Sequence, residues 1–382
     1  MSIPREVSRH RKAIDRIDAD ILKLLSSRAK EVHEIGKIKQ AHEAPIRVPE
    51  REKLLLDRLK LLNKGLYPDH AIESIYREII SASLALEAPL RIAYLGPPGT
   101  FSHQAALAAF GHSAGLDPQT EFRQIFEEVE KGAVSYGVIP IENSVEGMVY
   151  QTLDLLLSHQ LSVCAEIYLP IRHCFLTACT DLSQVKTIYT IGQAWGQCSI
   201  WLKSQGFDSR HFEEVSSTAR AAQMVRKRAA QAAAIASRQA AHVYGLPLYK
   251  DGIQDSAGNE TRFLVVGFDK PAPTGHDKTT LAFQVEDRVG VLASILNELS
   301  TAGINLSKIE SRPNRTKDWE YLFYIDVEGH ITERRVSKAL EKIKKYCTVF
   351  RHLGSYPRYR SEPARTPAGR LAKTGTRRVR KG

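Results

Sequence analysis

One uninterrupted helical segment constrains the fold of this chain more than any other feature of its sequence. Residues 6–41 contain no proline, and Gly36 is their only glycine. A helix of that length extends about 54 Å at 1.5 Å per residue. Because the rest of the first 88 residues is too short to cover it, we expect this segment to form a dimer.

The apolar stripe of this segment carries cations where a packing seam should be apolar. Three cations on one seam indicate a cavity that holds counter-anions, since a buried unpaired charge is costly. A single Lys or Arg on such a seam would instead extend its charged head group to solvent at the edge of the interface. Asp18 can neutralise one of these cations, and a small ligand with two carboxylates could neutralise the others. When the segment is written as heptad repeats, the residues of this seam are Arg11, Ile14, Asp18, Ile21, Leu25, Arg28, Val32, Ile35 and Lys39.

Two shorter helices are predicted next, and both bring polar residues to an apolar face. One opens at Pro49-Glu50, with proline in a first-turn position, and adds Arg51 and Glu52. The other follows Asp69 and has a stripe that ends in polar residues, made of Ile72, Tyr76, Ile79, Ser83 and Glu87.

The polar positions of these helices have a distinctive spacing: Arg11, Arg28, Gly36-Lys37-Ile38-Lys39, Arg47, Arg51-Glu52, Ser83 and Glu87. This spacing resembles that of the all-helical chorismate mutases. The resemblance implies an intertwined dimer of three-helix chains, in which Arg11 reaches the partner's chorismate site. It further implies that Arg28 and Arg51 hold the substrate carboxylates and that Glu52 accepts from the substrate hydroxyl. Ser83 belongs to the same set.

By the same resemblance, Lys39 and Glu87 donate to the ether oxygen of chorismate. Charge develops on that oxygen during a pericyclic rearrangement, which needs positioning and electrostatics and no covalent catalysis. Glu87 stands where other members have Gln, and a Glu donates only when it is protonated. We therefore expect mutase activity to fall at alkaline pH. Val48 replaces an Asp of some relatives, which affects only a minor substrate contact.

Residues 91–268 alternate predicted strands and helices, which indicates an α/β domain. Polar clusters lie at the strand–helix junctions, where such a domain places its cleft. Each cluster alone is typical of a helix cap, but together they predict an anion pocket rich in hydroxyls and amides. They contain no Cys-His or Ser-His-Asp arrangement, which argues against hydrolysis by an activated nucleophile. The candidate residues are Thr100, Ser102, Asn143, Ser144, Ser216, Ser217, Thr218, Thr261, Arg262 and Phe263.

Four stretches of this segment read YLGPPGTFSHQAA, GVIPIENSVEGMV, AAIASRQAAHVYGLPLY and NETRFLVVG, and they closely resemble prephenate dehydratases. The resemblance implies two lobes of the periplasmic-binding type, joined near residues 169–172 and 246–251. It also implies that prephenate loses water and carbon dioxide to give phenylpyruvate, with Thr261 as donor to the departing hydroxyl. A threonine is too weakly acidic to supply the proton alone, so another acid is expected behind it. Arg262 either holds a substrate carboxylate or is structural.

Residues 279–356 predict the element order βαββαβ, which is a ferredoxin-like α+β fold. The stretches DRVGVLASIL, GINLSKIESRP and YLFYIDVEGH resemble the ACT domains attached to prephenate dehydratases. The resemblance implies that L-phenylalanine binds between paired ACT domains, where an uncapped helix N-terminus at Gly290 suits its carboxylate. The sequence Val289-Gly290-Val291-Leu292 departs from the usual Pro-Gly-Ala-Leu, which affects affinity and not the fold. The implied residues are Gly290, Val291, Leu292, Asn305, Glu310, Ser311 and Arg312.

The formal net charge of +11 does not describe a nucleic-acid platform, because most of it sits at one end. Residues 358–382 carry nine basic side chains and one acidic one, whereas residues 91–357 carry 28 of each sign. We expect residues 357–382 to be a disordered basic tail, since they lack an apolar pattern. Nucleic-acid binding would depend on this tail alone and is not expected.

The five cysteines are odd in number and form no CxxC pair, which argues against a disulfide framework or a structural zinc site. The N-terminus lacks the apolar stretch of a signal peptide, and no run approaches the roughly 18 apolar residues of a membrane span. We therefore expect a cytoplasmic protein with no membrane partner, no metal and no cofactor.

The three resemblances together predict a multidomain bifunctional enzyme of phenylalanine biosynthesis, inhibited by L-phenylalanine. Its expected domains are a mutase at 1–88, a dehydratase at 91–268 and an ACT domain at 279–356, in a homodimer or higher homo-oligomer. One alternative is a regulatory amino-acid-binding protein with an inactive catalytic domain, which the intact arginine and TRF sets argue against. Another is an arogenate dehydratase, although a fused mutase, whose product is prephenate, favours prephenate.

Overall fold

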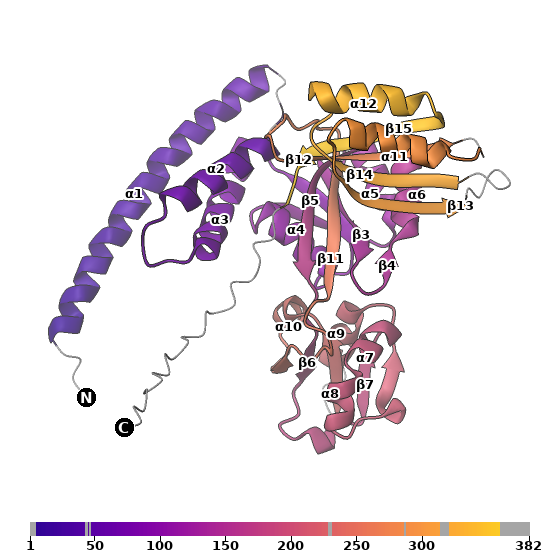
Figure 1. The fold of residues 1–382 in the computed structure, drawn as a ribbon. Helices are drawn as coiled ribbons and strands as arrows, with labels where there is room; N and C mark the ends of the chain where they lie inside the picture. Colours follow the sequence, from indigo (N-terminus) through magenta and orange to yellow (C-terminus); the bar gives the residue numbers. More distant parts are fainter. Residues whose placement is uncertain are drawn as a thin grey trace, which may run out of the picture.

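The structure is a computed structural model that describes residues 5–42, 45, 47–227, 231–285, 288–313 and 321–359. Most of the basic tail, residues 360–382, lies outside the described residues. Three parts follow one another along the chain: a helical part, a two-sheet α/β part and a third part with one four-stranded sheet (Figure 1). Among the described residues, no helix is both long and apolar enough to cross a membrane.

The helical part confirms the predicted long helix and its two shorter companions. It consists of α1 (Arg5–Ala41), α2 (Pro49–Leu62) and α3 (Asp69–Glu87). Helix α1 runs past the other two, and much of its N-terminal half has no neighbour among the described residues (Figure 1). Apolar side chains there are left in solvent: Ile14, Ile21 and Leu24 are 55%, 48% and 71% exposed. Exposed apolar side chains along one stripe of a helix are typical of an interaction surface.

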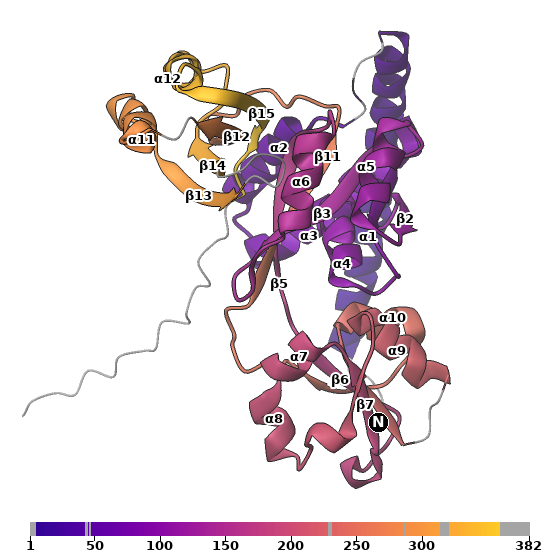
Figure 2. The same ribbon diagram turned by 90° about the vertical axis from the view of Figure 1, so that its right-hand side faces the viewer.

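The α/β part contains two sheets, and the chain passes from the first to the second and back. The first has the strand order β2-β1-β3-β11-β5, with β4 paired to β3, and the second has the order β10-β6-β9-β7-β8. We call these the six-stranded and the five-stranded lobe. Figure 2 shows the five-stranded lobe as a separate layer, reached from β5 and left towards β11. The strands of both lobes are β1 (Arg91–Leu95), β2 (Gly115–Gln119), β3 (Tyr136–Asn143), β4 (Gly147–Met148), β5 (Ser162–Pro170), β6 (Cys174–Thr177), β7 (Thr187–Thr190), β8 (Phe212–Glu214), β9 (Ala232–Ala236), β10 (Leu248–Asp251) and β11 (Glu260–Gly267).

Helices cover both lobes, and two of them begin at the polar clusters singled out in the sequence. Thr100 caps α4 by accepting from the backbone N–H of His103 at 3.2 Å, and Ser217 accepts from the N–H of Arg220 in the first turn of α9. The helices are α4 (Phe101–Phe110), α5 (Phe122–Glu130), α6 (Tyr150–Ser158), α7 (Gly192–Gln197), α8 (Ser199–Ser204), α9 (Thr218–Lys227) and α10 (Arg238–Tyr244), with short 3₁₀ turns η1 (Leu182–Gln184) and η2 (Ser209–His211).

The third part has the ferredoxin-like order predicted for it. Its elements are β12 (Asp277–Val285), α11 (Val291–Thr301), β13 (Leu306–Pro313), β14 (Tyr321–Glu328), α12 (Arg334–Lys344) and β15 (Cys347–Pro357), in a sheet of order β13-β14-β12-β15. The predicted start of the tail is wrong by three residues. Pro357 pairs with Asp277 in the sheet, Arg358 forms an ion pair with Glu328, and the ring of Tyr359 packs on another tyrosine of the six-stranded lobe.

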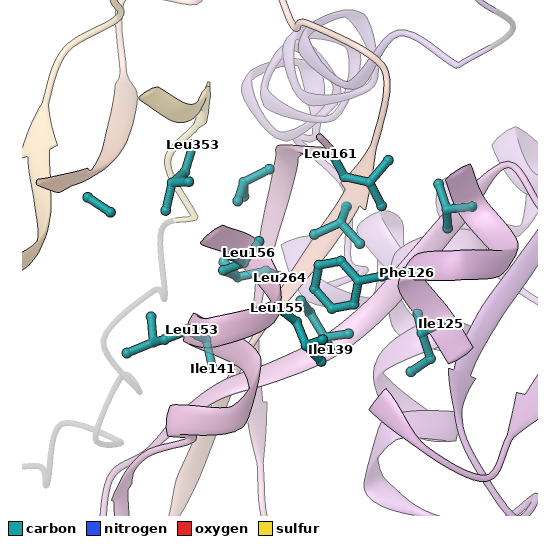
Figure 3. Close-up of a cluster of buried hydrophobic side chains, with 14 of the residues drawn as sticks. Ile125, Phe126, Ile139, Ile141, Leu153, Leu155, Leu156, Leu161, Leu264 and Leu353 are labelled. Atoms are coloured by element: carbon teal, nitrogen blue, oxygen red, sulfur yellow. The ribbon is translucent and has the colours of Figure 1, made fainter. Parts of the chain in front are cut away.

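One apolar core runs from the six-stranded lobe into this third part. Leu353 of β15 is 1% exposed and belongs to the same buried cluster as Leu156 of α6 and Leu264 of β11 (Figure 3). Arg351 reinforces the contact, because its guanidinium donates to the carbonyls of Leu157 and His159 at the end of α6. The ACT-like part therefore packs directly against the six-stranded lobe through a shared apolar core and is not an independent domain on a linker.

Candidate functional sites

A cavity of about 260 Å³ lies between the three helices of the first part. Six of the seven residues predicted to bind chorismate line it: Arg28, Lys39, Arg51, Glu52, Ser83 and Glu87, with Val32, Ile35, Val48, Leu55, Ile80 and Leu84 forming the apolar walls. The seventh, Arg11, does not line it. It lies 17 residues before Arg28 on the same helix, about 25 Å along the helix axis.

The polar side chains of this cavity are paired across the helices. Lys39 donates from Nζ to Oε2 of Glu87 at 2.6 Å, and Arg28 donates to the hydroxyl of Ser83. Ser83 in turn donates to the carbonyl of Ile79 at 2.6 Å. Cations and hydrogen-bond acceptors thus face one small space, and an anion with a hydroxyl fits that arrangement.

Gly36 explains how α1 and α3 approach each other beside this pair. A Cβ at Gly36 would lie 3.2 Å from Cα of Glu87, which is tighter than ordinary contact. The single glycine of the long helix therefore permits the close approach that brings Lys39 to Glu87. The sequence marked Gly36 only as part of a family pattern, and the structure gives the steric reason for it.

A second cavity, of about 240 Å³, lies between the two lobes of the α/β part. Eight of the ten residues predicted for the dehydratase pocket line it: Thr100, Ser102, Asn143, Ser216, Ser217, Thr218, Thr261 and Phe263. Phe101 and Asn259, which belong to the predicted polar clusters, line it too. The remaining lining residues were not predicted and are Pro140, Ile171, His173, Ile191, Gln193, Ala194 and Gln197. Residues from both lobes and from both connections between them meet here.

Thr261 is fixed in this cavity by an amide whose own orientation is fixed. Oδ1 of Asn143 accepts from the backbone N–H groups of Val145 and Glu146 at 2.9 and 3.0 Å. Its Nδ2 therefore faces Thr261 and donates to Oγ1 at 2.8 Å. Because the threonine oxygen accepts this bond, its own proton is left to point towards a ligand in the cavity.

His173 is the one histidine among the described residues that line this cavity. It is 3% exposed, and burial lowers its pKa, so the imidazole is neutral at neutral pH. Nε2 lies 3.0 Å from Oε1 of Gln197, which also accepts from Asn259 at 2.9 Å. The sequence did offer one signal for His173, since it is a lone histidine near the predicted crossing between the lobes. No Asp or Glu among the described residues lines this cavity, so none of them supplies the acid expected behind Thr261 from its wall.

Arg262 does not face this cavity, which favours the structural one of its two predicted roles over prephenate binding. Successive strand residues point to opposite faces, and its neighbours Thr261 and Phe263 take the cavity face. Arg262 is 3% exposed and pairs with Glu166 at 3.0 Å and with Asp326 of β14 at 2.5 Å. Burial opposes its charge, but these partners together with Tyr356 raise its pKa well above the usual range.

Ser144 does not line the cavity either. Its hydroxyl donates to the carbonyl of Gly258 at 3.1 Å and accepts from the N–H of Glu260 at 3.0 Å. These bonds fasten the loop after β3 to the start of β11. Ser144 therefore supports the strand that carries Thr261 and does not reach a ligand.

The residues expected to bind phenylalanine lie at three places in the domain. Gly290 has φ of +84° and precedes α11 without a side-chain cap, as predicted, and Val291 and Leu292 begin that helix. Asn305 lies beyond the other end of α11, just before β13, where its carbonyl accepts from the N–H of Glu328 at 2.9 Å. Glu310, Ser311 and Arg312 lie on β13, about 16 Å further along the chain at strand spacing. Two of these contact α6: Glu310 accepts from the hydroxyl of Tyr150 at 2.8 Å, and Arg312 pairs with Asp154.

Within the described ranges, no group of three or more His, Cys, Asp or Glu side chains is placed to hold a metal ion. All five cysteines lie in those ranges and are free thiols, three of them buried. Burial raises the pKa of the Cys174 thiol to about 12, which keeps it protonated and unreactive.

Comparison with known proteins matches each part of the chain to a family. The family model described as chorismate mutase type II matches residues 10–88, that of prephenate dehydratase matches residues 92–271, and that of the ACT domain matches residues 279–345. A relative from Aquifex aeolicus, named bifunctional chorismate mutase/prephenate dehydratase, is 44% identical over 357 residues, covering 92% of this chain and 98% of its own.

Two solved structures each resemble 70% of this chain. Prephenate dehydratase from Arthrobacter aurescens, in complex with L-Phe, is 36% identical with a TM-score of 0.65, covering 70% of this chain and 90% of its own. GqqA, described as a novel type of quorum quenching acylase, is 29% identical with a TM-score of 0.64, covering 70% of this chain and 97% of its own.

Proposed function

Because this chain belongs to the family of bifunctional chorismate mutase/prephenate dehydratases, we propose that its helical cavity rearranges chorismate and that its interlobe cavity converts the resulting prephenate to phenylpyruvate. The chain is an enzyme with both activities and an ACT regulatory domain. The observation that carries the assignment of sites is that two separate cavities each collect a predicted residue set. Prephenate, and not arogenate, is the second substrate, since the first cavity supplies it.

In the mutase cavity, Arg28 and Arg51 hold the two carboxylates and Glu52 accepts from the hydroxyl. These three contacts select the compact conformer of the substrate over its extended one. Selecting that conformer provides most of the catalysis that a pericyclic reaction requires. Lys39 donates to the ether oxygen as negative charge develops there. Glu87 donates to the same oxygen once it carries a proton, because the ionised carboxylate only accepts, as it does from Lys39.

In the dehydratase cavity, two helix N-termini from opposite lobes face the substrate. Thr100 to Ser102 begin α4, and Ser216 to Thr218 begin α9, and each helix is ten residues long. No lysine or arginine lines this cavity within the described residues, so the N–H groups and dipoles of these helices are the groups that attract the two prephenate carboxylates. The two-lobed periplasmic-binding type of closure would bring both ends onto one ligand.

Thr261 then donates its hydroxyl proton as a hydrogen bond to the departing hydroxyl of prephenate. The Asn143 amide holds the threonine oxygen, so the proton is directed to the substrate and not to the protein. The ring carboxylate leaves as carbon dioxide, and the electron pair of the broken carbon–carbon bond completes the aromatic ring. The hydroxyl leaves with its own bonding electrons and takes one proton from solvent to become water. Aromatisation drives the step, and the enzyme supplies position and a donor.

Two single substitutions separate the two activities in the full-length chain. Arg28→Ala should abolish consumption of chorismate and leave conversion of added prephenate intact, whereas Thr261→Val should do the reverse. Thr261→Ser, which keeps the hydroxyl, should retain dehydratase activity. A Thr261→Val enzyme that still forms phenylpyruvate at the wild-type rate would refute the role of Thr261.

The mutase works as a dimer in which Arg11 of each chain completes the site of the other. The exposed apolar stripe of α1 and the distance of Arg11 from its own cavity support this arrangement. A mixture of Arg11→Ala and Arg28→Ala chains, refolded together, would contain heterodimers with one intact site. It should recover about a quarter of wild-type mutase activity, because half the dimers carry one working site of two. No recovery would exclude a shared site.

L-Phenylalanine acts as feedback inhibitor through the ACT domain. The uncapped N-terminus of α11 at Gly290 would take its carboxylate, and the contacts of Glu310 and Arg312 with α6 would transmit its binding to the dehydratase lobe. The Arthrobacter dehydratase bound to L-Phe supports this proposal. Glu310→Gln should weaken inhibition of prephenate conversion by L-phenylalanine while leaving uninhibited activity unchanged.

A further inference from the structure

Glu52, which the proposed mutase mechanism places against the substrate hydroxyl, is held by a neighbouring arginine. Arg47 donates from Nε to Oε1 and from Nη2 to Oε2 of Glu52, both at 3.1 Å. Two parallel bonds fix both the position and the rotation of a carboxylate, which a single contact does not. Arg47 is 5% exposed and lies behind Glu52, outside the described residues that line the mutase cavity.

The remaining contacts of Arg47 are with the dehydratase domain. Its guanidinium carbon lies 4.2 Å from the centre of the Phe110 ring, and Nη2 also donates to the Ala109 carbonyl at 3.2 Å. Ala109 and Phe110 are the last residues of α4, whose terminal carbonyls lack partners within the helix. A cation at this end interacts favourably with the helix dipole and with the aromatic face.

We propose that Arg47 is a positioning residue of the mutase site, and that the end of α4 makes the dehydratase domain a structural part of that site. The inference rests on the role proposed above for Glu52. When a carboxylate is already oriented, less of the binding free energy of the substrate is lost to ordering that side chain. Burial opposes the charge of Arg47, but Glu52 raises its pKa above the usual range, so the guanidinium stays charged across the working pH range.

The test uses the full-length enzyme with Arg47→Met, which keeps the bulk of the side chain and removes its donors. Mutase kcat/KM should fall by about tenfold to a hundredfold, the effect of a small displacement of one binding group. Dehydratase activity of the same preparation should be retained and reports the folded fraction. An unchanged mutase kcat/KM would overturn the inference.

Arg77→Met is the matched control. Arg77 donates from Nη1 to the Ala108 carbonyl at 2.6 Å, so it docks on the same helix end, but its carboxylate partner is Glu73 and not Glu52. Its loss removes a docking contact without releasing Glu52, and mutase kcat/KM should be unchanged. An equal fall in both variants would show that docking alone matters and would overturn the positioning role.

A double-mutant cycle with Glu52→Gln separates this inference from the proposed mechanism. If Arg47 acts through Glu52, adding Arg47→Met to Glu52→Gln causes no further loss of mutase kcat/KM. Multiplied losses would overturn the inference while leaving the role of Glu52 intact. Full activity of Glu52→Gln alone would refute the role of Glu52 and the inference with it.

A variant in the other domain tests the role of α4 and covers the case in which Arg47→Met does not fold. Phe110→Leu keeps an apolar side chain and removes the aromatic face beneath Arg47. Mutase kcat/KM should fall several-fold while conversion of added prephenate is retained. If the mutase is unaffected by Phe110→Leu, α4 is not part of its site.

Discussion

Arg262 donates from Nη1 to Oδ2 of Asp326 at 2.5 Å, and this contact joins the strand of Thr261 to the ACT domain. Nε of Arg262 donates to Glu166 at 3.0 Å, and Lys278 of the ACT domain donates to the same glutamate at 2.6 Å. The hydroxyl of Tyr356 accepts from Nη2 at 2.9 Å, which completes a buried network between the two domains. The residue beside the proposed donor Thr261 is thus a structural anchor.

Arg262→Met should destabilise the contact between the dehydratase and ACT domains. Removing one partner of a buried ion pair costs about 3–5 kcal/mol, because the remaining charges stay buried. The unfolding temperature should fall, while the KM for prephenate of the folded enzyme should change little. Arg210→Met, which breaks an exposed pair with Asp208, is the control and should leave the unfolding temperature nearly unchanged. A raised KM with unchanged stability would instead restore Arg262 to the substrate site.

The local sequence pattern was sufficient to predict the helices and strands, and it also predicted part of the residue set that lines each cavity. The apolar period of α1 is a property of consecutive residues, so its bounds and its seam of cations were predictable. Alternation along β11 was also available, and it would have placed Arg262 opposite Thr261 once Thr261 was assigned to the cavity. Without that step, substrate binding and a structural role stayed equally open for Arg262.

Contacts between distant segments were not predictable from one sequence. His173 and Gln197 meet at the cavity only because the chain leaves one lobe and returns to it, and neither is adjacent in sequence to the polar clusters. The same holds for Arg47, whose partners Phe110 and Ala109 lie more than 60 residues away. Burial and pairing of such residues depend on tertiary packing, which local propensity does not encode.

Glu87→Gln should extend mutase activity to higher pH. Glu87 donates to the ether oxygen only when protonated, and the protonated fraction falls as pH rises, whereas an amide donates at every pH. The pH profiles of chorismate consumption should diverge on the alkaline side. Prephenate conversion by the same two proteins is the internal control and should have identical profiles. Superimposable mutase profiles would remove Glu87 from the role of donor.

His173 should make the folded enzyme less stable in mild acid. Burial lowers its pKa in the native state, whereas histidine in the unfolded chain titrates near about 6.5. Below that pH the unfolded state binds the proton more readily, so the free energy of unfolding decreases as pH falls towards the native pKa. His173→Asn should reduce this decrease between pH 7.5 and 5.5 in urea unfolding. The exposed His242→Asn should not; equal slopes in all three proteins would contradict the account.

Two truncations should differ although they are three residues apart. A chain ending at Tyr359 loses only residues 360–382, with eight basic side chains and one acidic one, and should keep both activities and the unfolding temperature. A chain ending at Tyr356 also loses the ion pair of Arg358 with Glu328 and the backbone bond from Tyr359 to Glu166 at 2.9 Å. Its unfolding temperature should fall by a few degrees. Identical melting curves would show that these contacts contribute nothing.

Conversion of chorismate to phenylpyruvate by the purified chain tests the central claim most directly. Chorismate should be consumed, phenylpyruvate should appear without any second enzyme, and L-phenylalanine should suppress its appearance more strongly than it suppresses chorismate consumption. Consumption of chorismate with accumulation of prephenate and no phenylpyruvate would contradict the assignment of the interlobe cavity. No consumption of chorismate, with added prephenate still converted, would contradict that of the helical cavity.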